Sequence, residues 1–98
     1  MITHLDEIIH QPTRTKIVAS LYALGEGEEI EFVSLKELLE LSDGNLSSHL
    51  TKLEEAGYVR IRKTFEGKRP KTYISLTTKG RKAFENYVKI LREILNVK

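Results

Sequence analysis

The sequence predicts one α+β domain that is mostly helical, with a three-stranded antiparallel sheet and a long C-terminal helix. Three observations lead to this fold class. Apolar residues recur at helical spacing in several segments, residues 58–65 alternate as a strand does, and glycine or hydroxyl residues stand where these segments end or begin. The 98 residues, 40% of them hydrophobic and 31% charged, suit a single hydrophobic core. We therefore treat residues 1–98 as one domain.

Residues 2–24 are expected to form the N-terminal helices. The first of these would place three apolar residues on one side: Leu5, Ile8 and Ile9. Pro12 interrupts this stripe, and because proline suits the first turn of a helix, a second helix is expected from there to the end of the segment. A polar loop rich in glycine and glutamate follows, and residues 30–33 are a candidate strand.

Residues 34–56 predict two short helices joined by a tight turn. Ser34 and Glu37 have the spacing of a capping box, so the first helix is expected to begin at Ser34 and to end near Leu41. The tripeptide Ser42-Asp43-Gly44 is typical of a turn, with Ser42 or Asp43 capping the second helix.

The second of these helices has an apolar side and a polar side. Leu46, Leu50 and Leu53 recur at i, i+4 and i+7 and are expected to face the core. The outward and flanking positions carry small or polar residues: Asn45, Ser47, Ser48, Thr51 and Lys52. Such side chains can meet the donors and acceptors of base edges when a helix lies in the major groove of DNA. Each of them taken singly could equally be an ordinary helix-start or surface residue.

Residues 58–76 predict a β-hairpin. The alternation in residues 58–65 places Val59 and Ile61 on one face and Arg60 and Arg62 on the other. The following residues, Glu66 to Pro70, have the composition of a turn, and the chain then returns as a second strand.

The hairpin and its surroundings are strongly basic. Residues 60–82 contain nine lysines and arginines against the single acid Glu66, a net charge of +8, whereas residues 1–41 carry a net charge of −5. A one-sided basic surface is typical of proteins that bind a polyanion, although charge runs can also be simple solvated faces. The candidate DNA-contacting cations of the hairpin are Arg62, Lys63, Lys68, Arg69 and Lys71.

Residues 77–97 predict the long final helix, with Thr77 as its cap. Its apolar stripe is broad for the core of a small domain, which favours a partner helix; packing within the chain is the alternative. The candidate dimer interface combines this stripe with the N-terminal one: Leu5, Ile8, Ile9, Phe84, Tyr87, Val88, Leu91, Ile94 and Leu95.

With these segments in place, the chain resembles small winged helix-turn-helix regulators of the MarR/ArsR-like superfamily, in particular stand-alone archaeal and bacterial proteins of about this length. The resemblance covers nearly the whole chain and depends on the order of five stretches: His10-Gln11-Pro12-Thr13-Arg14, Ser42 to Leu50, Leu53 to Val59, Phe65 to Thr72, and Leu76 to Arg81.

The resemblance implies a homodimeric transcriptional regulator that binds a pseudo-palindromic operator in double-stranded DNA. Residues 34–56 would be the helix-turn-helix, residues 58–76 the wing on the flanking backbone, and residues 77–97 the dimerisation helix. Metal-sensing relatives use cysteines, which this chain lacks, and many ligand-sensing relatives have additional helices. We therefore expect either no small effector or one bound at the dimer interface. The alternative function is a protein–protein interaction module in a transcription-related complex.

The sequence offers little support for other classes of function. Without cysteine there is no disulfide framework, and no apolar run approaches the length of a membrane span, so a cytoplasmic location is expected. The three histidines, His4, His10 and His49, fit no familiar metal-ligand spacing, and no nucleophile–base pattern or phosphate-binding glycine loop is present. We expect no enzymatic activity and no cofactor. The abundance of lysine, glutamate and isoleucine hints at a thermophilic source.

Overall fold

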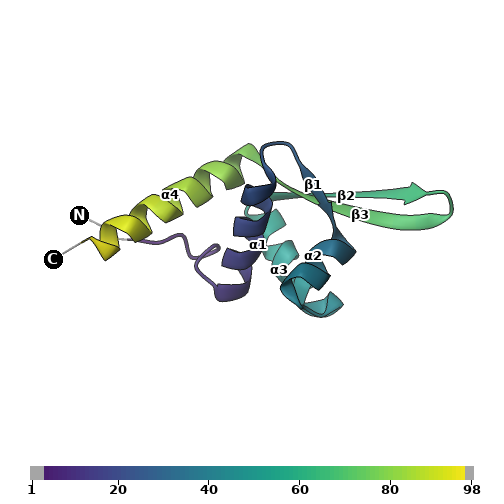
Figure 1. The fold of residues 1–98 in the computed structure, drawn as a ribbon, viewed down its shortest axis with the longest axis horizontal. Coiled ribbons are helices and arrows are strands. Elements are labelled where there is room, and N and C mark those ends of the chain that lie inside the picture. Colours follow the sequence, from purple (N-terminus) through teal and green to yellow (C-terminus); the bar gives the residue numbers. More distant parts are fainter. Residues whose placement is uncertain (1–3, 97–98) are drawn as a thin grey trace.

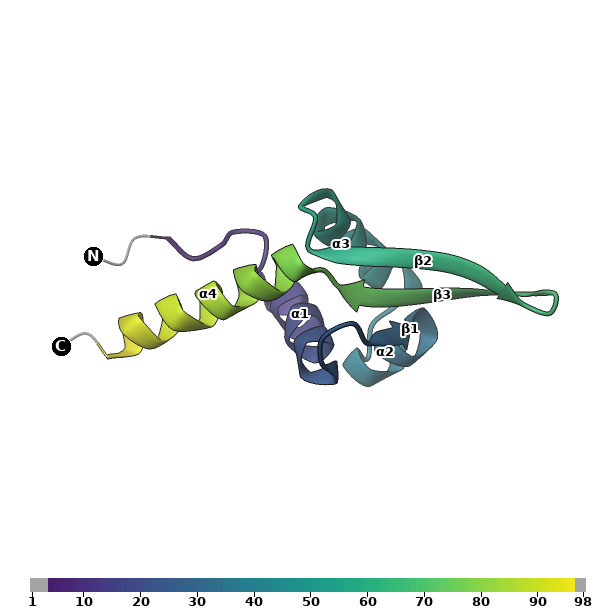
Figure 2. The same ribbon diagram turned by 90° about the horizontal axis from the view of Figure 1, so that it is seen from above.

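The computed structural model describes residues 4–96 and confirms the predicted fold class (Figure 1). The elements follow in the order α1 (Pro12–Leu24), β1 (Glu29–Glu31), α2 (Phe32–Leu39), α3 (Asp43–Glu55), β2 (Val59–Glu66), β3 (Arg69–Leu76) and α4 (Thr78–Leu95). The molecule is elongated, with extents of 57 × 25 × 21 Å, because α4 and the β2–β3 hairpin leave the central helices in opposite directions (Figures 1 and 2).

The sheet is antiparallel, with β3 between β1 and β2. Ile74 of β3 lies opposite Ile30 of β1 and Ile61 of β2, so apolar side chains meet on one face of the sheet at its inner end. The short β1 covers only that inner end, and the outer half of the hairpin therefore projects as two strands alone (Figure 2). This projecting half is the outer part of the hairpin predicted as the wing, and from here on we call it the wing.

The hydrophobic core lies between α1, α3 and the inner end of the sheet. Leu46, Leu50 and Leu53 of α3 are buried, as their spacing predicts, and they meet buried residues of α1, of α2 and of the sheet: Ile17, Val18, Leu21, Leu35, Val59 and Ile74. Ile9 and Tyr87, both predicted at a dimer interface, also belong to this core, with exposures of 0% and 5%. Their side chains are covered by the chain itself, so they offer no surface to a partner.

The N-terminal stretch is not the helix that its apolar spacing suggests. Residues 7–9 form a turn in which the Asp6 carboxylate accepts hydrogen bonds from the backbone N–H groups of Ile8 (2.9 Å) and Ile9 (3.1 Å). An aspartate that bonds to nearby backbone competes with helix formation, and Pro12 then begins α1 as predicted. Residues 2 and 3 of the expected helix lie outside the described part of the chain.

Helix α2 begins two residues earlier than the capping-box spacing predicts. It follows β1 directly, with Glu31 at the cap position and no capping hydrogen bond from a side chain, so Ser34 lies inside the helix. The start is set by the strand, because Glu31 still pairs with Tyr73 of β3 and Phe32 packs against the core.

The turn of the helix-turn-helix lies slightly before its predicted position. Glu40 adopts a left-handed backbone conformation (φ 55°) and ends α2, whereas Asp43 and Gly44 already belong to α3. Of the two predicted cap residues, Ser42 is the cap of α3, and its hydroxyl oxygen accepts a hydrogen bond from the Asn45 N–H at 3.1 Å. Lys36 and Asp43 form an ion pair (2.8 Å) across the turn.

Thr77 caps α4 as predicted and ties it to the turn after α3. Its hydroxyl accepts from the Gly80 N–H (2.9 Å) and donates to the Gly57 carbonyl (2.6 Å). Gly80 packs so closely on this turn that a Cβ atom there would lie 2.2 Å from the Tyr58 carbonyl oxygen. The close approach requires glycine and fixes the direction in which α4 leaves the domain.

Candidate nucleic-acid interface

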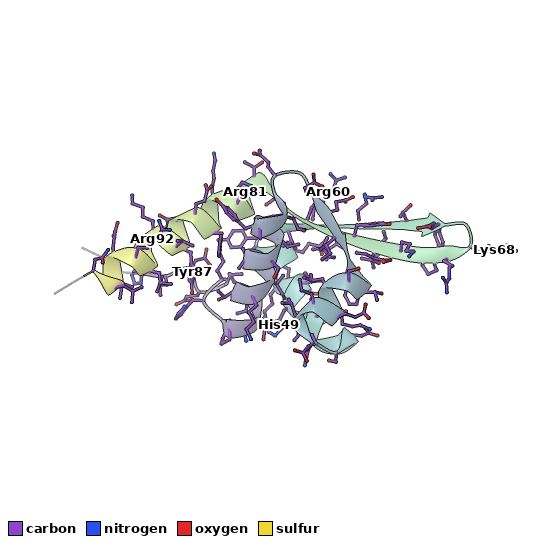
Figure 3. The ribbon with its side chains drawn as sticks, in the orientation of Figure 1. His49, Arg60, Lys68, Arg81, Tyr87 and Arg92 are labelled. Carbon is purple, nitrogen blue, oxygen red and sulfur yellow. The ribbon has the colours of Figure 1, made fainter. Side chains whose placement is uncertain are left out.

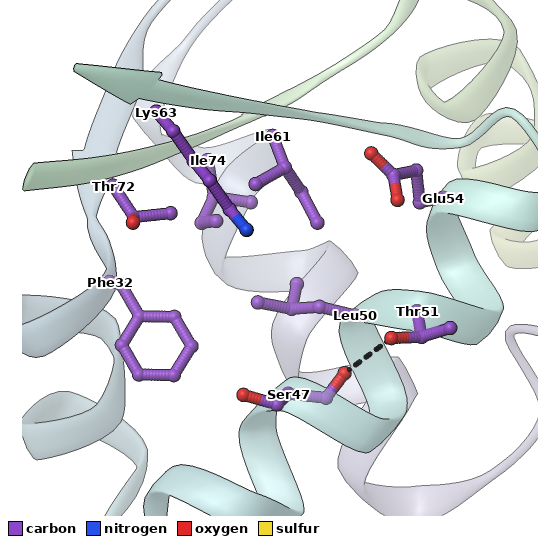
Figure 4. Close-up of a pocket in the computed structure, with 9 residues that line it drawn as sticks. All are labelled: Phe32, Ser47, Leu50, Thr51, Glu54, Ile61, Lys63, Thr72 and Ile74. Carbon is purple, nitrogen blue, oxygen red and sulfur yellow. Dashed lines mark hydrogen bonds between the residues drawn. The ribbon is translucent and has the colours of Figure 1, made fainter.

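The polar side of α3 is open to solvent along its length. All five residues predicted from the helical wheel are exposed: Asn45, Ser47, Ser48, Thr51 and Lys52. The Thr51 hydroxyl donates to the Ser47 carbonyl at 2.9 Å (Figure 4). Asn45 and Ser48 make no side-chain hydrogen bond within the described part of the chain. The first turn of α3 therefore presents small polar groups at the positive end of the helix dipole.

A groove separates α3 from the sheet (Figure 4). It has a volume of about 420 Å³ and is lined from α3 by Ser47, Leu50, Thr51 and Glu54, from α2 by Phe32, and from the hairpin by Ile61, Lys63, Thr72 and Ile74. Lys63 and Thr72 are cross-strand partners and lie one same-face step beyond the Ile61–Ile74 pair. We call this side of the hairpin its α3-facing side.

The opposite side of the hairpin holds two of the predicted DNA contacts. Arg62 makes two hydrogen bonds to the Glu29 carboxylate, at 2.9 and 2.8 Å, and its guanidinium lies 4.6 Å from the centre of the Tyr73 ring. Lys71 pairs with Glu31 at 2.9 Å. The hydrogen bond from Arg62 lowers the pKa of Glu29, and the bond to Glu31 raises the pKa of Lys71.

The structure therefore does not bring all five predicted cations to one surface. Lys63 lies at the groove. Arg62 and Lys71 form ion pairs with the glutamates of β1 on the other side of the hairpin. Lys68 and Arg69 are exposed at the tip of the wing (Figure 3). The three ion pairs of residues 4–96 involve neither tip cation. Strand alternation already separates Arg62 from Lys63 in the sequence, but the pairing with β1 follows only from the sheet order.

One link to α3 could not be recognised from the sequence. The Arg14 guanidinium donates to the Ile8 carbonyl (2.6 Å) and lies 3.2 Å from Nδ1 of His49, which is on α3. Burial lowers the pKa of His49, and the positive charges of Arg14 and Lys52 lower it further. The contact joins the N-terminal turn to the helix that carries the exposed polar face.

A second hydrogen bond connects the N-terminal turn with Tyr58, which lies between α3 and β2. The Tyr58 hydroxyl donates a hydrogen bond to the Asp6 carboxylate. Burial, followed by this hydrogen bond, raises the pKa of Tyr58 to about 12. The turn is therefore connected to the beginning of β2 as well as to α3.

The apolar residues left uncovered on α4 lie towards its far end. Ile94 and Leu95 are 41% and 75% exposed, whereas five predicted interface residues are partly buried against the core: Leu5, Ile8, Phe84, Val88 and Leu91. In Figure 2 the distal half of α4 extends away from the helical body, beside the N-terminal stretch.

Two further kinds of site are absent from residues 4–96. No three His, Asp or Glu side chains there lie close enough together to hold a metal ion. No helix in that range combines the length and hydropathy needed to cross a membrane.

Comparison with known proteins places this geometry in a family. Residues 13–95 match the model of the winged helix DNA-binding domain. An uncharacterised protein of Methanocaldococcus jannaschii is 50% identical over 82 residues, which cover 84% of this chain and 86% of that protein.

Solved structures of similar fold include transcriptional regulators. A transcriptional regulator homologue from Pyrococcus horikoshii has a TM-score of 0.83 and 26% identity, over 93% of this chain and 87% of its own. MepR, a transcription regulator of the Staphylococcus aureus multidrug efflux pump MepA, has a TM-score of 0.62 and 25% identity, over 82% of this chain and 56% of its own. Because the family model covers residues 13–95, which include every strand and helix of the chain except the first residue of α1, this chain belongs to the winged helix DNA-binding domain family.

Proposed function

We propose that the protein is a homodimeric transcriptional regulator that binds specific sites in double-stranded DNA. The observation that carries the proposal is the exposed polar face of α3 next to a basic hairpin that projects beyond the rest of the domain. A helix fits the major groove, and cations on a projecting hairpin neutralise phosphates beside it. The family match and the regulator from P. horikoshii support the same class of function.

In the proposed complex, α3 reads base edges and the wing positions the domain on the backbone. Asn45 and Ser48 are the first candidates for base contacts, because both are exposed at the start of α3 and have no partner among the described side chains. Lys68 and Arg69 at the wing tip would contact phosphates, with Lys63 nearer to α3. Arg62 and Lys71 would act mainly within the protein, by holding β1 to the hairpin.

A dimer would form through the far half of α4. Ile94 and Leu95 supply exposed apolar surface there, and a symmetric pairing would extend it with the partly buried Val88 and Leu91. Two-fold symmetry then requires two half-sites of inverted sequence, about 34 Å apart or a near multiple of that distance.

The specificity of α3 can be tested with a site selected from random duplexes. Asn45→Ala and Ser48→Ala should each reduce the preference for the selected duplex over a random one, by about 1–3 kcal/mol for each lost base contact. Glu55→Ala, at the exposed C-terminal end of the same helix, is the matched control and should leave this preference unchanged. Equal losses on selected and random duplexes would show that the two residues only position the helix.

A further inference from the structure

The wing tip carries an aromatic residue that the chain does not cover. Phe65, near the end of β2, is 72% exposed, and its cross-strand partner is Pro70. It belongs neither to the core nor to the apolar residues packed against it. Single exposed apolar residues are common on protein surfaces, so exposure alone does not indicate a binding site. The evidence for a binding role is the position of Phe65 on the hairpin.

Phe65 lies on the α3-facing side of the hairpin. Side chains alternate along a strand, and the pairs Ile61–Ile74 and Lys63–Thr72 line the groove beside α3. The Phe65–Pro70 pair is the next step on that side, roughly 7 Å further from the core. A duplex that contacts the polar side of α3 and the wing would therefore face this ring.

The charges around the ring favour a nucleic acid over an apolar partner. Lys68 and Arg69 are exposed in the adjoining turn, Lys63 is two residues away on the same side, and Glu66 is the only acid between residues 60 and 82. An apolar side chain with cations next to it matches a groove of DNA, in which the base edges lie at the bottom and the phosphates line both sides.

Building on the proposed function, we propose that Phe65 is a wedge that inserts into the minor groove and partly unstacks a base step beside the α3 site. The phosphates on both walls would be held by Lys68 and Arg69, which offsets the cost of unstacking. Steps of the type TA unstack most easily and A-tracts resist. The wedge would thus add a sequence preference at a position where no side chain reads a base edge.

The test uses two duplexes of about 25 base pairs with the same base composition, one with TA steps and one with an A-tract. A 2-aminopurine placed at one step after another reports unstacking by a rise in fluorescence, and anisotropy reports affinity. The variants are Phe65→Ala, Phe65→Leu, which keeps an apolar wedge, and the control Leu38→Ala, which removes a side chain of α2 that is 63% exposed.

We expect the wild-type protein to bind the TA duplex about threefold to tenfold more tightly and to raise the fluorescence at one step. Phe65→Ala should lose the rise in fluorescence and the preference for the TA duplex but keep the salt dependence of binding. Phe65→Leu should keep part of the rise and part of the preference. Leu38→Ala should match the wild type. Binding with an unchanged preference and fluorescence in Phe65→Ala would overturn the wedge and leave the proposed function standing. Absence of binding to either duplex at low salt would overturn both.

Discussion

At the scale of single residues, the side of a strand on which a cation lies decides what it can contact. Arg62 and Lys63 are neighbours in the sequence, yet one is held by Glu29 and Tyr73 while the other lines the groove beside α3. The same reasoning places Phe65 with Lys63. Alternation in the sequence separates these residues correctly, but it does not reveal that β1 supplies the carboxylates for one side.

His49 gives the residue scale a prediction about pH. The pKa of His49 is lowered below 6.5 in the folded protein. As the pH falls through that value, the unfolded chain therefore binds more protons than the folded protein does. The free energy of unfolding should therefore decrease as the pH falls below about 6.5 and stop decreasing once the pH passes the lower folded pKa. His49→Gln should remove this part of the pH dependence in urea denaturation.

His4, which is exposed, provides the control for this measurement. His4→Gln makes the same change of side chain at that exposed position. An identical loss in both variants, or no loss in His49→Gln, would contradict the assignment of this pH dependence to His49, whose pKa is lowered first by burial and then by the charges of Arg14 and Lys52.

At the scale of elements, the sequence predicted α1, α3, the hairpin and α4, because each has both a periodic apolar pattern and a local start or stop signal. It was wrong at two places, once because long-range strand pairing overrides a local signal and once because a local hydrogen bond competes with the helix. Ser34 and Glu37 match a capping box, but pairing of Glu31 with Tyr73 sets the start of α2 two residues earlier. The N-terminal apolar stripe failed as a helix because Asp6 bonds to the backbone of its own turn.

Ser42, which caps α3, and Ser34, which lies inside α2, make a matched test of where the two helices begin. Ser42→Ala removes the hydroxyl that accepts from the Asn45 N–H and should lower the free energy of unfolding by about 1 kcal/mol. Ser34→Ala, inside α2 and without a capping bond, should change it by less than about 0.5 kcal/mol. Chemical denaturation measures both, and a larger loss at Ser34 than at Ser42 would restore the capping-box interpretation.

At the scale of the whole molecule, the domain presents two projecting ends with different chemistry (Figure 1). The wing is basic, and the far half of α4 carries exposed apolar residues. The sequence predicted both ends as functional surfaces. On α4 it could not separate Tyr87, which the chain buries itself, from the exposed Ile94 and Leu95, because one apolar stripe serves both the core and the exposed end of the helix. Ile9 is buried from a different segment, the N-terminal turn.

The proposed dimer predicts a mass near twice 11.3 kDa in sedimentation equilibrium. Ile94→Glu with Leu95→Glu should reduce it to about one chain, because charges placed in an apolar interface are costly to bury. Leu38→Glu, which places one charge at an exposed position of α2, should leave the mass unchanged. A wild-type protein that stays monomeric at the concentrations where it binds DNA would contradict the dimer.

The central claim, that the wing and α3 bind DNA, is tested most directly by fluorescence anisotropy on a random duplex of about 25 base pairs across a range of salt. We predict that log affinity falls linearly with log salt concentration, with a slope of several units. Lys68→Gln with Arg69→Gln should make the slope shallower by about two units, one for each lost phosphate contact. Arg62→Gln with Lys71→Gln removes the same charge from the other side of the hairpin and should change the slope much less. Absence of binding at low salt, or equal slopes in the two double variants and the wild type, would contradict the account.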